Sequence, residues 1–222
     1  MKDKKQRAAR IIDILEKAYP EAKTTLDATT PWELLVGAIL ASQCTDERVN
    51  KITPQLFAAY PTVYEMAEGE IKDIENLIRS CGIYRNKAKA LKGSAQKLIK
   101  EYNGEVPQTR EQLLDFPGVG RKIANLILGD AFHKQAVVVD THCARISKLL
   151  GLTSEENPAK IERDLEAVLP LESYTDWGHF MVFHGRSICK ARCRTCVRCP
   201  LLYLCDYGSK QDLAGKGAED CV

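Results

Sequence analysis

Apolar side chains recur at helical spacing along most of the chain, which predicts a protein built of helices. Each stripe of such residues can form the buried face of one amphipathic helix. The clearest stripes are Ile11, Ile12 and Leu15; Leu34, Leu35, Ala38 and Ile39; Ile71, Ile74, Leu77 and Ile78; Leu91, Ala95 and Leu98; and Ile161, Leu165 and Val168. Only residues 136–139 are β-branched enough for a strand, and one short strand cannot build a sheet. The pattern therefore predicts an all-α fold.

Polar residues mark the ends of these helices. A threonine three residues before Glu or Gln is the signature of a capping box, in which each side chain bonds the other residue's backbone N–H. Such pairs ahead of predicted helices include Thr30 with Glu33, Thr62 with Glu65, and Thr109 with Gln112. Gly82 is expected to cap the C-terminus of the helix over 71–78. Pro54 is expected to kink or restart the helix that Thr45 begins.

Composition limits the kind of protein. With 222 residues, 45% of them hydrophobic, the chain can form one large domain or two small ones with an ample core. The net charge of +2 excludes a globally polybasic protein, so any nucleic-acid footprint must be local. No apolar run is long enough to span a membrane, and the first residues lack the apolar stretch of a secretory signal. We therefore expect a cytoplasmic protein without a membrane partner.

Cysteines gather towards the C-terminus. Five of the nine, Cys189, Cys193, Cys196, Cys199 and Cys205, fall in one short segment. Disulfides are rare in reducing compartments, so the cluster indicates metal ligation. The set Cys189-x6-Cys196-x2-Cys199-x5-Cys205 can hold a cubane iron–sulfur cluster or one zinc ion, and the spacing does not decide between them. Cys193 leaves a second ligand register open.

The same segment is basic. It carries Arg186, Lys190, Arg192, Arg194 and Arg198, with no acidic residue between positions 186 and 198. Cations gathered on one loop can contact the phosphates of a nucleic acid. The alternative is a solvated basic surface that binds nothing.

A glycine-rich turn ahead of a predicted helix is the main candidate for ligand binding. Within residues 114–122, Gly118, Val119 and Gly120 form the turn, and Arg121 and Lys122 open the helix. Glycines let the backbone approach a ligand closely, and the unpaired N–H groups of a helix N-terminus attract anions. The turn can therefore hold a phosphate. Alternatively, it only connects two core helices.

Two residues could carry chemistry. An amine attacks carbon only when it is neutral, so a nucleophilic Lys122 would need burial or a neighbouring cation such as Arg121. Alternatively, Lys122 only pairs with a phosphate. Asp140 stands at the expected start of the next helix, where it can serve as the N-cap and also take a proton from the amine. We interpret His142 as a buried residue that orients its neighbours. The pairing suggests an enzyme that acts on a phosphodiester polymer.

Taken together, these motifs resemble the endonuclease III family, DNA glycosylase/lyases of the helix-hairpin-helix superfamily. The resemblance rests on the turn with Lys122, the Val-Asp-Thr-His segment around Asp140 and the C-x6-C-x2-C-x5-C segment, in that order. Residues 40–46 and 82–84 also resemble family segments, and the likeness runs from about residue 8 to residue 206. Ile123 and Phe116 depart from the threonine and leucine that are common in the family.

The resemblance implies a fold of two helical domains with a DNA-binding cleft between them. Residues 24–133 would form a six-helix domain with the helix-hairpin-helix motif. Residues 1–23 and 134–208 would form an iron–sulfur cluster domain, and residues 209–222 a disordered C-terminal tail. The cofactor would be a 4Fe–4S cluster on Cys189, Cys196, Cys199 and Cys205.

The resemblance also implies roles for single residues. Lys122 would be the Schiff-base lysine and Asp140 the catalytic aspartate. Gln43 would fill the hole that the extruded base leaves in the duplex, and Ile83 would insert as a wedge. The remaining implied DNA contacts are Gly118, Val119, Gly120, Arg121, Lys190, Arg192 and Arg194.

The implied function is base-excision DNA repair by a bifunctional enzyme. It would remove oxidised or ring-damaged pyrimidines from duplex DNA and cleave the abasic site by β-elimination. We expect a monomer whose partner is duplex DNA with damaged bases or abasic sites, and no small-molecule cosubstrate. One alternative is an adenine-removing relative, which usually lacks a lysine at this turn. Another is a non-catalytic, cluster-bearing DNA-binding module, which would not need Lys122 with Asp140. A third alternative is a protein whose cysteines bind zinc, which would give a colourless preparation rather than a brown one.

Overall fold

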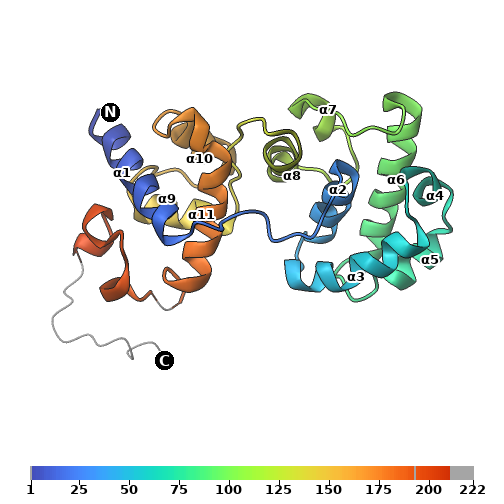
Figure 1. Cartoon of the computed structure of the whole chain (residues 1–222), viewed down its shortest axis with the longest axis horizontal. Coiled ribbons are helices and arrows are strands. Elements are labelled where there is room, and N and C mark those ends of the chain that lie inside the picture. The colour runs from blue at the N-terminus through green and yellow to red at the C-terminus, as the bar shows by residue number, and fades with distance from the viewer. Residues whose placement is uncertain (1, 193, 211–222) are drawn as a thin grey trace. The chain divides into compact units, whose positions relative to one another are not determined.

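The computed structural model describes residues 2–192 and 194–210 and divides the chain into two compact units (Figure 1). Unit 1 comprises Met1–Lys23 and Gln135–Val222, and unit 2 comprises Thr24–Lys134. The described residues form helices and loops without a β-strand, and their one isolated bridge joins Cys189 to Arg194. The predicted all-α fold is therefore confirmed. Cys193 and most of the predicted C-terminal tail, from residue 211 onwards, lie outside the described residues.

Unit 2 consists of short helices packed around one long helix. Its elements are α2 (Pro31–Leu40), α3 (Asp46–Ala59), α4 (Val63–Glu68), α5 (Ile71–Leu77), α6 (Tyr84–Tyr102), α7 (Arg110–Leu114), α8 (Arg121–Leu126) and the π-helical turn η1 (Ile127–Ala131). The long helix α6 packs against α4, α5 and α2 (Figure 1). It does so through the predicted stripe, since Leu91, Ala95 and Leu98 have no exposed surface.

Unit 1 brings the N-terminal helix together with the C-terminal half of the chain. Its elements are α1 (Lys2–Ala18), α9 (Thr141–Leu149), α10 (Pro158–Glu166), η2 (Leu171–Ser173), α11 (Tyr174–Ser187), η3 (Cys196–Arg198), η4 (Leu202–Leu204) and η5 (Gly208–Lys210). Ile11 and Leu15 of α1 share one core with Trp177 of α11, whose indole N–H donates to Ser147 Oγ over 3.3 Å. This core fixes the end of α11, from which the cysteine segment starts. None of the described helices is long and apolar enough to cross a bilayer.

Residues 136–139 form an irregular buried segment rather than a strand. Val137 and Val139 belong to the core of unit 1, and no ladder partner occurs among the described residues. Gly178 of α11 leaves room for Val138, because a Cβ atom at Gly178 would lie 3.1 Å from the Cβ of Val138. The β-branched run is therefore explained by burial, and it leads directly into α9.

The predicted capping boxes form to different degrees. Thr62 and Glu65 make a complete box, in which the Thr62 N–H donates to Glu65 Oε2 over 3.0 Å. Thr30 caps α2 by accepting from Glu33 N at 3.1 Å. The Glu33 carboxylate, however, accepts from Thr29 N at 2.7 Å, one residue earlier than the box predicts.

The predicted cap at Gly82 is wrong. Helix α5 ends at Leu77 with Ile78 as its C-cap, so Gly82 lies beyond the helix end. The residue with left-handed backbone in this connection is Ile83, at φ 57°. A β-branched side chain rarely adopts this conformation, so the sequence gives no sign of it.

Of the kink or restart expected at Pro54, the restart is wrong, because α3 continues through Pro54 to Ala59. Proline removes one backbone hydrogen bond from a helix. The buried residues Val49, Ile52 and Leu56 lie on both sides of Pro54 and hold α3 against its neighbours. Tertiary packing therefore outweighs the local cost.

Replacing Thr62 with alanine is expected to lower the free energy of unfolding by about 1 kcal/mol, because the first turn of α4 loses its side-chain acceptor. Thr62→Asn should retain most of the stability, since asparagine caps as well as threonine. Urea denaturation followed by circular dichroism measures both. Equal losses in the two variants would contradict the assignment of the cap.

Candidate active site and metal centre

The glycine-rich turn connects α7 to α8 and is held against α6. Gly118 has φ 77°, which residues with a side chain rarely adopt. A Cβ atom at Gly118 would lie 3.2 Å from the Cβ of Ala90 on α6. One turn further along α6, a Cβ atom at Gly93 would lie 3.3 Å from Pro117 Cγ. The turn and α6 therefore approach as closely as glycine allows.

Helix α8 begins with an open backbone end. Gly120 is its N-cap, so no side chain covers the N–H groups of the first turn. A Cβ atom at Gly120 would have no neighbour within 4 Å. Exposed N–H groups at the positive end of a helix suit a phosphate. Val119 is buried, so it could offer a ligand only its backbone.

Lys122 stands in the first turn of α8 with an exposed side chain. Ile123 and Ala124 are buried, so they anchor the helix while Arg121 and Lys122 face solvent. The protein alone therefore does not bury the amine of Lys122. Helix α8 passes directly into η1, a π-helical turn of a kind that is frequent at functional sites.

Asp140 is the N-cap of α9. Its Oδ1 accepts a hydrogen bond from Cys143 N over 2.7 Å, which confirms the predicted cap. Asp140 is half-buried and follows the buried residues 136–139. The cap bond and the buried segment together fix the carboxylate within unit 1, whereas Lys122 is fixed within unit 2.

His142 is half-buried on the first turn of α9. Its Nδ1 lies 3.4 Å from Nη2 of Arg145. Gly185 on α11 leaves the room that the ring occupies, because a Cβ atom at Gly185 would collide with it. These contacts fit the expected orienting role of His142, although the ring is less buried than predicted.

Gln43 and Ile83 lie on two touching loops of unit 2. Both have left-handed backbone, with φ 54° and 57°. Such strain costs about 1–3 kcal/mol and is typical of functional sites. Both side chains are exposed, that of Ile83 to 51%. A Cβ atom at Gly82 would lie 3.4 Å from the Gln43 carbonyl oxygen, so the structure brings these two predicted DNA contacts onto adjoining loops.

The four predicted ligand cysteines line one pocket of unit 1. Cys189, Cys196, Cys199 and Cys205 border about 390 Å³ of space, its open mouth included. Apolar side chains such as Ile146 supply much of the remaining wall. All four cysteines are free thiols. The pocket can therefore hold a group that is bound by four sulfur atoms.

Polar groups surround these sulfur atoms. Arg145 Nη1 donates to Cys189 Sγ over 3.5 Å, and Gly208 N donates to Cys205 Sγ over 3.3 Å. Burial and, to a smaller extent, the other three cysteines raise the pKa of Cys199 to about 11. Metals bind cysteine as thiolate, so a group entering this pocket must displace protons.

A buried histidine also lies beside the sulfur atoms. His184 Nε2 lies 3.6 Å from Cys199 Sγ, and its Nδ1 lies 2.9 Å from the Tyr19 hydroxyl on α1. Burial, followed by the nearby Arg145, lowers the pKa of His184 to about 4. The ring is therefore neutral at pH 7. No sequence pattern indicates the contact of His184 with Cys199.

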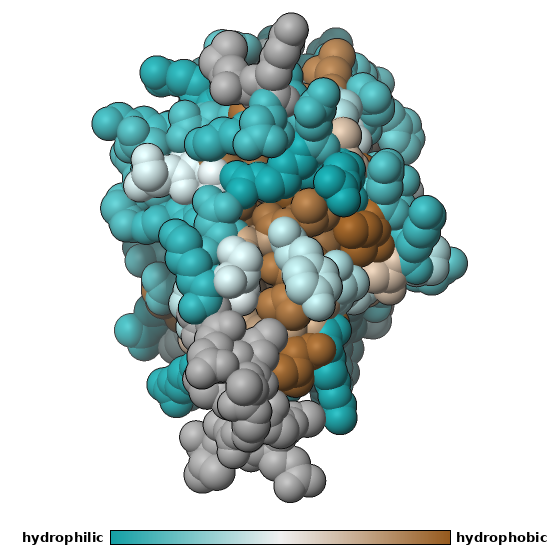
Figure 2. Space-filling view, turned by 90° about the vertical axis from the view of Figure 1, so that its left-hand side faces the viewer, coloured by the Kyte–Doolittle hydropathy of each residue, from teal (hydrophilic) through white to brown (hydrophobic). Residues whose placement is uncertain are grey.

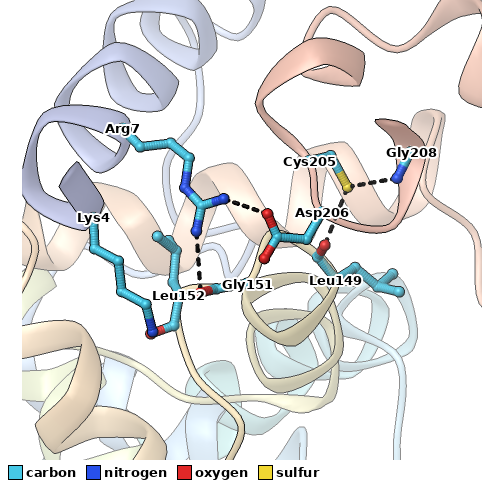
Figure 3. A network of polar contacts seen from close by, with 8 residues as sticks. All are labelled: Lys4, Arg7, Leu149, Gly151, Leu152, Cys205, Asp206 and Gly208. Atoms are coloured by element: carbon cyan, nitrogen blue, oxygen red, sulfur yellow. Dashed lines mark hydrogen bonds and ion pairs between the residues drawn. The ribbon is translucent and has the colours of Figure 1, made fainter. Parts of the chain in front are cut away.

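A charged latch joins α1 to the cysteine segment (Figure 3). Arg7 donates to the carboxylate of Asp206 and, over 3.1 Å, to the carbonyl oxygen of Gly151. Gly151 has φ 72°, and a Cβ atom there would collide with Asp206. Because Asp206 directly follows Cys205, this latch positions the last of the four cysteines.

The predicted basic contacts differ in their exposure. Lys190 and Arg192 are exposed, whereas Arg194 is partly buried, with its guanidinium carbon 5.1 Å from the centre of the Tyr207 ring. Arg194 also lines the cysteine pocket. Lys190 and Arg192 are therefore open to a phosphate, and Arg194 packs against the cysteine site.

Figure 2 shows a face on which apolar side chains gather within a largely hydrophilic surface.

Comparison with known proteins places this geometry in a family. Residues 36–171 match the HhH-GPD superfamily base excision DNA repair protein family. Endonuclease III of Synechocystis sp. is 49% identical over 206 residues, 92% of this chain and 94% of the relative. Endonuclease III of Escherichia coli (strain K12) is 34% identical over 94% of this chain and 99% of the relative. A solved structure of a trapped endonuclease III–DNA covalent intermediate has a TM-score of 0.88 at 41% identity, covering 93% of this chain and 97% of that one. The chain therefore belongs to the HhH-GPD superfamily of base excision DNA repair proteins.

Proposed function

We propose that Lys122 is the nucleophile through which this DNA glycosylase and abasic-site lyase acts, with Asp140 as its proton acceptor. The observation that carries the proposal is the open start of α8. Gly120 leaves backbone N–H groups uncovered, and Lys122 stands exposed one residue into the same helix. A phosphate held by the turn would place the adjoining sugar within reach of the amine.

The exposed amine of Lys122 fits a site that DNA completes. Duplex DNA that covers α8 would exclude water from the amine, which the protein alone leaves solvated. Binding of the substrate would therefore activate the nucleophile.

The reaction follows from these parts. Lys122 Nζ bonds to the anomeric carbon of the sugar, and the damaged base leaves with the electrons of its glycosidic bond. The carboxylate of Asp140, fixed by its bond to Cys143 N, takes the proton that the amine releases. The sugar ring then opens: the nitrogen lone pair forms a C=N bond as the C1′–O4′ bond breaks, and O4′ takes the proton that Asp140 had accepted. The resulting protonated imine acidifies the C–H bond at C2′, and β-elimination expels the 3′ phosphate and so breaks the strand on the 3′ side. The cooperation of Lys122 and Asp140 on one nucleotide is part of the proposal.

Gln43 and Ile83 would occupy the gap that the extruded base leaves in the duplex. Extruding a base costs a few kcal/mol, and damage lowers that cost. The exposed apolar side chain of Ile83 can wedge between bases, and the amide of Gln43 can bond the orphaned partner base. Their touching loops support a joint role at one gap.

We assign a 4Fe–4S cluster to the cysteine pocket. In a cubane each thiolate binds a different iron, so its sulfur ligands lie further apart than those of one zinc ion. Four free thiols that border one pocket with a largely apolar remaining wall can supply the four sulfur ligands of such a cluster. When bound, the cluster would cross-link Cys189, Cys196, Cys199 and Cys205 and brace the basic segment that bears Lys190 and Arg192.

The proposed substrates are duplexes with oxidised or ring-damaged pyrimidines or with abasic sites. The exposed lysine on α8 argues against an adenine-removing enzyme without a nucleophilic amine, and against a module that only binds DNA. A relative at 41% identity has been captured as a covalent intermediate with DNA, which supports covalent chemistry here.

Replacing Lys122 with glutamine should abolish covalent trapping by borohydride on a duplex with a damaged pyrimidine, because no imine can form. Strand cleavage should fall by at least a thousandfold. The matched control is Lys134→Gln, which changes an exposed lysine of the same unit. This variant should form the covalent complex with DNA as the wild type does. Trapping by Lys122→Gln would assign the nucleophile elsewhere, and absence of trapping in the wild type would refute the lyase activity.

The two glycines of the turn should respond differently to alanine. Gly118→Ala is expected to lower the free energy of unfolding by about 2 kcal/mol, since it forces a side chain into φ 77° and against Ala90. Gly120→Ala has room for its methyl group and should change stability little, yet weaken DNA binding by obstructing the helix end. Urea denaturation and fluorescence anisotropy with a labelled duplex separate the two effects. Unchanged DNA affinity of Gly120→Ala would count against the phosphate site.

Removing the bonds of Arg7 to Asp206 and Gly151 should make the proposed cluster easier to extract. Arg7→Ala removes the bonds to Asp206 and Gly151, and is expected to speed the loss of visible absorbance in the presence of a chelator about tenfold. Arg10→Ala changes an exposed arginine of the same helix and should behave like the wild type. Iron and sulfide analysis checks the starting load. A colourless wild type that contains zinc would overturn the cluster assignment.

A further inference from the structure

Two cysteines outside the metal pocket flank the loops of Gln43 and Ile83. Cys44 directly follows Gln43, and Cys81 stands two residues before Ile83. The loops touch at Gly82, where an added Cβ atom would lie 3.4 Å from the Gln43 carbonyl oxygen. Both cysteines are free thiols; Cys44 is half-buried and Cys81 has no exposed surface.

The two thiols interact with each other. Burial and, after it, the neighbouring Cys44 thiol raise the pKa of Cys81 to about 11. The charges of Lys87 and Arg48 act in the opposite direction on Cys81. Cys44 and two cations therefore lie near Cys81.

Lys87 makes this an unusual place for a pair of thiols. It is only 5% exposed, and its Nζ donates to the carbonyl oxygen of Leu40 over 2.9 Å at the end of α2. Burial lowers the pKa of Lys87, while Cys81 and Cys44 raise it. The cation of Lys87 lowers the pKa of Cys81 and so offsets part of the effect of burial.

We propose that Cys44 and Cys81 form a reactive dithiol that closes to a disulfide and ties the Gln43 loop to the Ile83 loop. The partly exposed Cys44 is the entry point, and the buried Cys81 is the resolving thiol. Small-molecule disulfides such as oxidised glutathione are the oxidant.

The exchange balances in two steps. The Cys44 thiolate attacks one sulfur of oxidised glutathione, which forms a mixed disulfide and releases one glutathione thiolate. The Cys81 thiolate then attacks the Cys44 sulfur, which forms the protein disulfide and releases the second glutathione. The two protein thiols lose two protons and two electrons in total, and one oxidised glutathione becomes two reduced molecules.

Closing the disulfide should impair the recognition of damaged DNA, an effect that rests on the proposed function. A disulfide fixes the distance between the two sulfur atoms, so it restrains the backbones on both sides. Gln43 and Ile83 occupy those backbones in strained left-handed conformations. The oxidised protein is therefore expected to bind a duplex with an abasic-site analogue about tenfold more weakly.

Peptide mapping tests the dithiol without reference to DNA. The full-length, cluster-loaded protein is equilibrated in glutathione buffers of increasing oxidation, alkylated and digested with trypsin. Tryptic peptides 24–48 and 80–85, each with a single cysteine, should appear joined by a disulfide. Cys81→Ala should instead stop at glutathione on Cys44, and Cys44→Ser should give neither product. Failure of the joined pair to form in the wild type, or its replacement by glutathione on Cys44 alone, would overturn the proposal.

Fluorescence anisotropy with the abasic-site duplex tests the consequence. The tenfold loss should appear in the oxidised wild type, reverse with dithiothreitol and be absent from Cys44→Ser. Unchanged affinity of a fully linked protein would overturn the effect on DNA recognition. If the reduced wild type fails to bind the duplex, the proposed function fails instead, and the peptide map still decides on the dithiol.

Discussion

The close approach of the glycine-rich turn to α6 is the constraint on which the candidate active site of unit 2 depends. A side chain at Gly118 would crowd Ala90 and would also have to adopt φ 77°, so the turn keeps its shape only with glycine. That shape leaves Gly120 at an open helix end and sets Lys122 in the first turn of α8. The proposed nucleophile and the proposed anion site thus both depend on one backbone contact.

In both units a proposed catalytic residue stands at the start of a helix. Asp140 is the N-cap of α9 in unit 1, and Lys122 lies in the first turn of α8 in unit 2. Helix starts are rigid and carry a positive partial charge, so they hold an anion or a carboxylate without a flexible side chain. The far side of α9 then supports the cysteine pocket, since Arg145 donates to Cys189. One helix therefore connects the proposed proton acceptor to the proposed cluster site, and the Arg7 latch secures the opposite wall (Figure 3).

Patterns among residues close in the sequence predicted the features that depend on those residues alone. The apolar stripes gave the helices, the Thr62 box and the Asp140 cap formed, and the cysteine spacing placed four thiols in one pocket. Contacts between distant residues could not be predicted, because no periodic pattern links Arg7 to Asp206 or His184 to Cys199. At Pro54, packing of buried neighbours overrode the local preference of proline, whereas α5 ends at Leu77, ahead of Gly82, and the left-handed residue of that connection is Ile83.

The most direct test of the account is to locate the covalent bond itself. The wild-type protein is reduced with borohydride during turnover of a duplex with a damaged pyrimidine, digested, and analysed by mass spectrometry for the peptide that carries the sugar. The account predicts that the sugar remnant lies on Lys122, at the start of α8. A remnant on any other amine, such as Lys87 or the N-terminus, would contradict it.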